Sequence, residues 1–112
     1  MSLVDTKLLI DFLKKVRGFL QENEITCYDD LDNVFFRLFG KVDFFPEPYG
    51  NLYSYLDVVI DAKEHSFETI SDHYTYGEAI KDLNFIIKQI EENNIDEISN
   101  ETFTSKLKKV YK

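Results

Sequence analysis

Residues 77–92, GEAIKDLNFIIKQIEE, decide the fold class of this 112-residue chain. Their apolar side chains recur every three or four positions, which is the period of one face of an α-helix. Charged residues such as Lys81 and Lys88 lie off that face. The stretch therefore predicts an amphipathic helix that begins at Gly77 and Glu78 and ends at Asn93 and Asn94. The apolar face comprises Ala79, Ile80, Leu83, Ile86, Ile87 and Ile90.

Helical spacing also organises the first half of the chain. Apolar residues at intervals of three and four run through residues 9–20, after Asp5, whose residue type caps helix N-termini. They recur over residues 31–42, where we expect a helix to begin at Asp29 or Asp30. Two prolines and a glycine within residues 46–50 end this pattern, because proline lacks the amide hydrogen that a helix interior needs.

The second half continues in the same way. We expect a third helix over residues 52–60 with Asn51 as its N-cap, and residues 66–70 have the spacing of a short helical turn. A last helix is expected to follow Ser99 or Asn100. No stretch sustains the two-residue alternation of a β-strand. The sequence therefore predicts an all-α fold, a single compact bundle of five or six short helices that takes in the whole chain, 1–112, as one domain.

Composition and charge narrow the classes of partner and compartment. The chain has 21 acidic and 13 basic residues, a net charge of -8, and a single cysteine, Cys27. Nucleic acid and anionic membranes bind basic surfaces, so we expect neither as a partner. One cysteine forms no internal disulfide, which favours a reducing, cytoplasmic location. Asp5, Lys7 and Asp11 interrupt the apolar N-terminal residues, which therefore fit neither a signal peptide nor a membrane span.

The negative charge is concentrated in the middle of the chain. Residues 1–41 have a net charge of -1, residues 42–105 of -11, and residues 106–112 of +4. Five of the seven tyrosines fall in the middle block. Carboxylates attract a basic partner and speed its encounter, and tyrosine rings supply contact area. Two interpretations stay open: a partner-binding surface, or a solvated acidic face with tyrosine rings packed against the core.

No motif in the sequence indicates catalysis. A glycine-rich phosphate loop, an HExxH pair and a nucleophile elbow are all missing from it. His65, His73 and the nearby Asp61 have the chemistry of metal ligands, but their spacing matches no metal-binding motif. We therefore expect a protein that is not an enzyme and that uses no metal or other cofactor.

The last third of the chain carries a family resemblance. The motif DHYTYGEA at residues 72–79 leads into the amphipathic helix, and ISNE at residues 98–101 then caps the expected last helix. This pattern resembles the C-terminal half of the Maf-type bacterial toxin-immunity proteins. The resemblance implies a small bacterial protein that neutralises a toxin by binding it.

The first half is similar in layout to the colicin nuclease-immunity proteins. Residues 31–42 resemble their acidic second helix, and residues 46–55 resemble their Pro-Gly segment and tyrosine pair. The chain departs from that layout in two ways. About ten additional residues follow Tyr55, and Ser54 separates it from Tyr53. The likeness implies that the acidic helix and the tyrosines contact the toxin.

These observations lead to one expected function and one alternative. We expect an immunity protein or antitoxin that binds and neutralises a basic toxin, with nucleases among the candidates, through an acidic, tyrosine-bearing surface. The alternative is a non-enzymatic helical adaptor or regulatory protein, with Phe44 and Phe45 in a homodimer interface; the chain is a monomer or a homodimer. Near the start of a helix, acids also suit the helix dipole. The expected partner-binding residues are Asp29, Asp30, Asp32, Asp43, Glu47, Tyr49, Tyr53, Tyr55 and Asp57.

Overall fold

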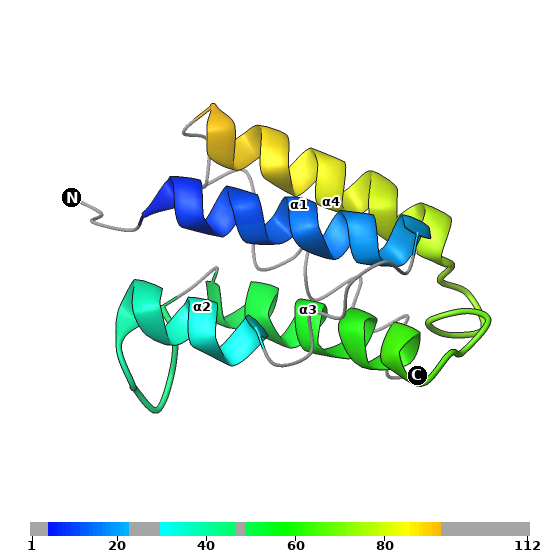
Figure 1. The fold of residues 1–112 in the computed structure, drawn as a ribbon, viewed down its shortest axis with the longest axis horizontal. Coiled ribbons are helices and arrows are strands. Elements are labelled where there is room, and N and C mark those ends of the chain that lie inside the picture. Colours follow the sequence, from blue (N-terminus) through cyan, green and yellow to red (C-terminus); the bar gives the residue numbers. More distant parts are fainter. Residues whose placement is uncertain (1–4, 23–29, 47–48, 93–112) are drawn as a thin grey trace.

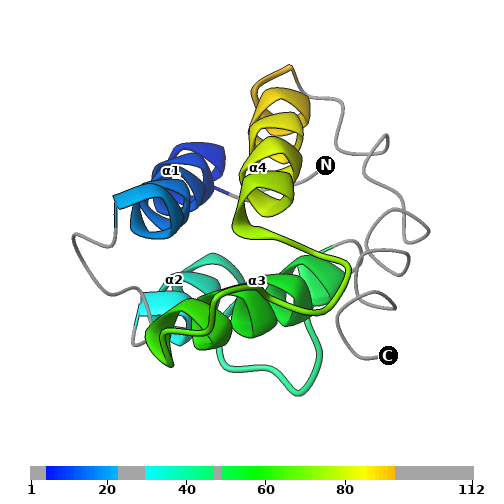
Figure 2. The ribbon, with the colours of Figure 1, turned by 90° about the vertical axis from the view of Figure 1, so that its right-hand side faces the viewer.

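The computed structural model describes residues 5–22, 30–46 and 49–92, and within these residues it contains four α-helices and no β-strand. In the end-on view, α1 and α4 lie side by side in one layer, and α2 and α3 form the layer beneath them (Figure 2). Figure 1 shows the same two layers from the side. The helices are α1 (Thr6–Glu22), α2 (Asp30–Phe39), α3 (Tyr49–Glu64) and α4 (Tyr76–Glu91).

The predicted all-α class is confirmed over these ranges, but the number of helices is four rather than five or six. The helix expected after Ser99 or Asn100 lies outside the described residues. Residues 66–70 do not form a helical turn: α3 ends at Glu64, and Ser66 just beyond it takes a left-handed φ of 60°. The chain then bends, and Ser71 pairs with Tyr74 through backbone hydrogen bonds of 3.2 Å in both directions.

The boundaries of α1 and α2 follow from local hydrogen bonds. The carboxylate of Asp5 accepts a hydrogen bond from the amide of Leu8 at 3.1 Å, which confirms its role at the start of α1. α2 begins at Asp30, as expected, but ends before Val42. Gly40 takes a φ of 81°, a conformation that favours glycine, and its amide donates to the carbonyl of Phe36 at 2.7 Å.

The starts of α3 and α4 lie earlier than their sequence patterns indicate. α3 begins at Tyr49, whose amide donates to the carbonyl of Pro46 at 2.7 Å, so Asn51 lies inside the first turn instead of capping it. α4 begins one residue before Gly77 and has a capping box. The hydroxyl of Thr75 accepts from the amide of Glu78 at 3.2 Å, and the Glu78 carboxylate accepts from the Thr75 amide at 3.1 Å.

The core lies between the two layers and draws on all four helices. Each fully buried aliphatic or aromatic side chain contributes about 1.5–3 kcal/mol to folding. The residues of this core that are entirely inaccessible to solvent include Leu9, Leu13 and Val16 of α1, Phe35 of α2, Leu56 and Val59 of α3, and Ala79 and Leu83 of α4.

No helix among the described residues combines the length and the apolar content needed to cross a bilayer.

A buried hydrogen-bonded chain fastens the connection between α3 and α4 to both helices. Tyr55 and Tyr74 are fully buried, their rings meet edge to face, and their hydroxyls share a hydrogen bond. The Tyr74 hydroxyl also donates to the carboxylate of Asp82 on α4. Burial, together with the adjoining hydroxyl and carboxylate, raises the pKa of Tyr74 well above its ordinary value, so this hydroxyl stays protonated.

We predict that Tyr74→Phe lowers the free energy of unfolding by roughly 1–3 kcal/mol, because it removes a buried hydroxyl and both of its hydrogen bonds. Urea denaturation followed by circular dichroism measures this difference. Tyr76→Phe is the matched control. The Tyr76 hydroxyl donates a single hydrogen bond, to the carbonyl of Phe67 at 2.7 Å, and this bond is exposed to solvent. Equal losses in the two variants would contradict a special role for the buried chain.

Candidate protein-binding site

An aromatic cluster joins α2, the connection after it and α3. The ring of Phe45 lies 5.3, 6.2 and 5.7 Å from the rings of Phe35, Phe36 and Phe39 on α2, measured between centroids. It also lies 5.1 Å from the ring of Tyr53 on α3. Aromatic pairs at such separations are attractive beyond the area that they bury. Phe45 therefore holds the two helices of the lower layer in one arrangement.

This arrangement brings acids from two helices together. The hydroxyl of Tyr53 on α3 donates a hydrogen bond to the carboxylate of Asp32 on α2. Asp57 and Asp61 follow Tyr53 at intervals of four residues, which places them on the same side of α3. We call Asp32, Tyr53, Asp57 and Asp61 the α2–α3 acidic face.

The carboxylates of this face repel one another. Partial burial, followed by the negative charges of Asp61 and Asp32, raises the pKa of Asp57 above its ordinary value. Burial likewise raises the pKa of Tyr53, and the hydrogen bond to Asp32 adds to that effect. Within the described ranges, no Lys or Arg forms an ion pair with these three acids. The ion-pair partner of Asp61 is His65, at 3.3 Å, which is charged only when protonated.

The acids that contact α1 are in a different situation, because lysines of α1 neutralise them. The Asp30 carboxylate forms an ion pair with Lys15, so this predicted binding residue already has a cationic partner in the same chain. Two more ion pairs link Lys7 to Asp11 at 3.0 Å and Lys14 to Glu91 at 3.8 Å. On the α2–α3 acidic face, by contrast, no Lys or Arg among the described residues forms an ion pair with Asp32, Asp57 or Asp61.

The structure brings some of the predicted binding residues together. Asp32, Tyr53 and Asp57 belong to the acidic face, and Asp43 lines a cavity beside Tyr53. Asp30 lies apart from them, at its ion pair with α1. The remaining two acids of the prediction, Asp29 and Glu47, lie outside the described residues.

Two of the predicted tyrosines lie in the core and not on a surface where a partner would meet them. Tyr55 is fully buried against Tyr74, and Tyr49 is 9% exposed with its ring 5.0 Å from that of Phe39. The reason is their register, since both lie on the stripe of α3 that faces the other helices. For these two side chains, packing against the core is the correct interpretation.

The sequence prediction left Asp61 out of the binding set. Its spacing of four residues from Asp57 was the available signal, because i and i+4 positions share a helix face. Asp61 enters the sequence prediction only as a metal-ligand candidate beside His65. The two residues do form a contact, but within the described part of the chain no three His, Cys, Asp or Glu residues are grouped as metal ligands.

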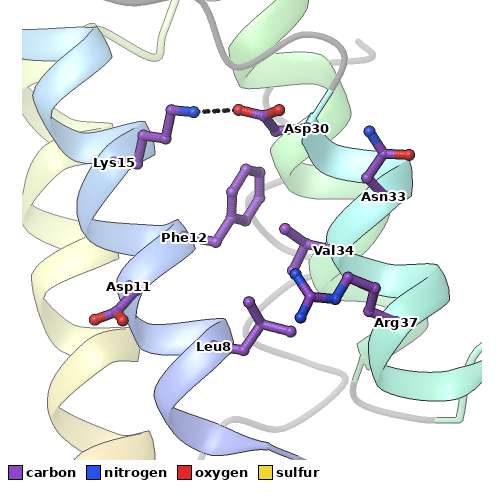
Figure 3. A pocket seen from close by; sticks show the side chains of 8 residues that line it. All are labelled: Leu8, Asp11, Phe12, Lys15, Asp30, Asn33, Val34 and Arg37. Carbon is purple, nitrogen blue, oxygen red and sulfur yellow. Dashed lines mark hydrogen bonds and ion pairs between the residues drawn. The ribbon is translucent and has the colours of Figure 1, made fainter.

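Two cavities open near these helices. One, of about 310 Å³, lies between α1 and α2, with Leu8, Phe12 and Val34 directed toward the space between the helices (Figure 3). Its charged lining is mixed, and the ion pair between Lys15 and Asp30 crosses one end of it. The other, of about 320 Å³, adjoins the acidic face; we call it the aromatic cavity. It is lined by Asp43, Phe44, Phe45, Gly50, Asn51, Tyr53 and Ser54.

Comparisons of the chain with protein-family models, with curated proteins and with solved structures found no match. The resemblance to toxin-immunity proteins therefore stays a prediction.

We predict that Asp57→Asn raises the free energy of unfolding at pH 7 by roughly a few tenths of a kcal/mol, because it removes a repelled surface charge. The pKa of Asp57 is higher in the folded than in the unfolded protein, so its ionisation lowers stability as pH rises through the folded value. The advantage of the variant should vanish below the ordinary pKa of 3.8, where Asp57 is protonated in both states.

Urea denaturation at pH 7 and pH 3 tests this prediction, with Asp72→Asn as the control for an exposed acid in the turn before α4. A destabilised Asp57→Asn protein at pH 7 would show that this carboxylate has a favourable partner and would remove the electrostatic basis of the acidic face.

Proposed function

We propose that this chain is an immunity protein or antitoxin that binds a basic bacterial toxin through the α2–α3 acidic face. The observation that supports the proposal most is the gathering of Asp32, Asp57 and Asp61 without a Lys or Arg partner among the described residues. Like charges held side by side lower stability, so their arrangement is better explained by a cationic partner than by folding.

The chemistry of such a face suits fast and selective binding of a basic protein. Negative potential steers a positively charged partner into productive encounters, at rates that fall as salt is added. Tyr53 is half-buried, and its hydroxyl is directed at Asp32, so ring and carboxylate are already ordered before a partner arrives. Ordered groups lose less entropy on binding, which strengthens the complex.

A nuclease fits the proposal as the kind of toxin. Nucleic-acid-binding clefts are lined by Lys and Arg that neutralise phosphates. A row of carboxylates competes for the same cationic groups and blocks the cleft without any reaction of its own. The assignment of the partner as a toxin comes from the family resemblance of residues 72–111 and from the layout of residues 31–55.

The exposed apolar residues favour a second candidate, a helical adaptor that forms a homodimer. Phe44 is 87% exposed and Val42 is 45% exposed, and they lie two positions apart in the connection between α2 and α3. Phe45, by contrast, is turned into the aromatic cluster. Light scattering separates the two candidates, since a stable dimer with Phe44 in its interface supports the adaptor.

We predict that the double variant Asp57→Asn/Asp61→Asn slows association with the toxin by about tenfold or more at low salt, because it removes two charges that steer the encounter. The candidate toxin is the product of the gene next to the one that encodes this chain, and surface plasmon resonance measures the rate. Neutralisation of the toxin in cells should weaken in parallel.

Asp11→Asn/Asp72→Asn is the matched control, since it makes the same change in net charge at exposed positions away from the face. It should change the rate less than about twofold, and the difference between the two double variants should shrink as salt is raised. Equal slowing by both pairs would mean that only net charge matters and would refute the assigned surface.

A further inference from the structure

The aromatic cavity combines three features. Its volume is about 320 Å³, it is open beside the acidic face, and it has both aromatic rings and a carboxylate in its lining. The rings are those of Phe44, Phe45 and Tyr53, and the carboxylate is that of Asp43. The segment that supplies most of them projects from the lower layer on the side away from α1 and α4 (Figures 1 and 2).

The exposure of Phe44 requires an explanation. With 87% of its surface in contact with solvent, it is the most exposed large apolar side chain of the described residues. The neighbouring Phe45 is half-buried, and its ring contacts Tyr53. A ring that stands free beside a cavity offers its face to an incoming group at no cost in lost packing.

The charge of the residues that line the cavity indicates the charge of the incoming group. Asp43 is the one charged residue in the lining, and within the described ranges it forms no ion pair. The cavity between α1 and α2 differs, because Lys15 and Arg37 contribute to its lining alongside two acids. Of these two cavities, the aromatic cavity is the one whose only charged lining residue is a carboxylate, and Asp32 and Asp57 add to its negative charge through their position around Tyr53.

We propose that the aromatic cavity receives an arginine side chain of the basic partner. The guanidinium group is planar, stacks on aromatic faces and pairs with a carboxylate through two parallel hydrogen bonds. The free face of Phe44 and the carboxylate of Asp43 supply these two interactions. Lysine fits less well, because its compact ammonium group is more strongly hydrated and does not stack.

The size of the cavity agrees with one side chain. Pockets that bind drug-sized ligands measure about 300–1,000 Å³, so this cavity lies at the lower limit. A large cofactor does not fit such a space, whereas the long, thin side chain of arginine does. The proposal rests on the proposed function for the nature of the partner, and it adds the residue type that anchors the complex.

The test is a titration of the isotope-labelled full chain with the peptide acetyl-Gly-Arg-Gly-amide, followed by NMR. We expect weak binding, with a dissociation constant of about 1–10 mM, since a single side chain makes few contacts. Ring signals of Phe44, Phe45 and Tyr53 should shift. The same peptide with citrulline, which keeps the shape of arginine and removes its charge, should not bind.

Two variants with matched controls locate the site. Phe44→Ala and Asp43→Asn change exposed residues, so both should fold normally and bind the arginine peptide at least about fivefold more weakly. Phe85→Ala and Asp72→Asn, at exposed positions elsewhere, should bind it as the unchanged chain does. Binding of citrulline or lysine peptide as tight as that of arginine would overturn the proposal. So would shifts confined to the cavity between α1 and α2.

The outcome separates this proposal from the proposed function. If the toxin candidate does not bind while the arginine peptide binds at Phe44, the immunity function fails and the arginine site stands. If the toxin candidate binds and Phe44→Ala and Asp43→Asn leave its affinity unchanged, the arginine site fails and the acidic face remains the binding surface.

Discussion

The packing of the Phe45 ring between α2 and α3 is the interaction on which the lower layer depends. Gly40 ends α2, and residues 41–46 then lead towards α3 in a non-helical conformation. Phe45 anchors that segment by contacting three rings of α2 and Tyr53 of α3. This contact, together with the direct contact between the rings of Tyr53 and Phe35, whose centroids lie 5.3 Å apart, sets the position of Asp32 beside Tyr53.

Charge is distributed differently over the two layers. On α1, lysines pair with acids of α1, α2 and α4 and so cancel charge, and the pair of Lys15 with Asp30 joins the two layers. On α3, Asp57 and Asp61 follow Tyr53 on a side of the helix that no described lysine or arginine reaches. The mutual repulsion of these acids reduces stability, and a cationic partner relieves it. The acidic face thereby links a local cost in folding to a gain in binding.

The sequence predicts the parts of this structure that depend on local pattern. Regular apolar spacing locates α1 and α4, and Asp5 is recognisable as a helix cap. The apolar spacing of α3 also places Tyr55 on the buried face of that helix. The acids near Tyr55 in the sequence favour a surface position instead, and that prediction is wrong. Packing between helices brings Lys15 to Asp30 and Asp32 close to Asp57. A linear sequence pattern does not reveal either contact.

We infer that the carboxylates of α2 and α3 form one unneutralised negative face. Paramagnetic relaxation of the amide protons, measured with a cationic and with a neutral nitroxide in solution, tests it without any partner. We expect the relaxation enhancement by the cationic probe to exceed that by the neutral probe most strongly around Asp32, Asp57 and Asp61, and least on the exposed side of α1 near Lys7 and Lys14. If the ratio of the relaxation enhancements by the two probes is the same on α1 and on α3, the acidic face is contradicted.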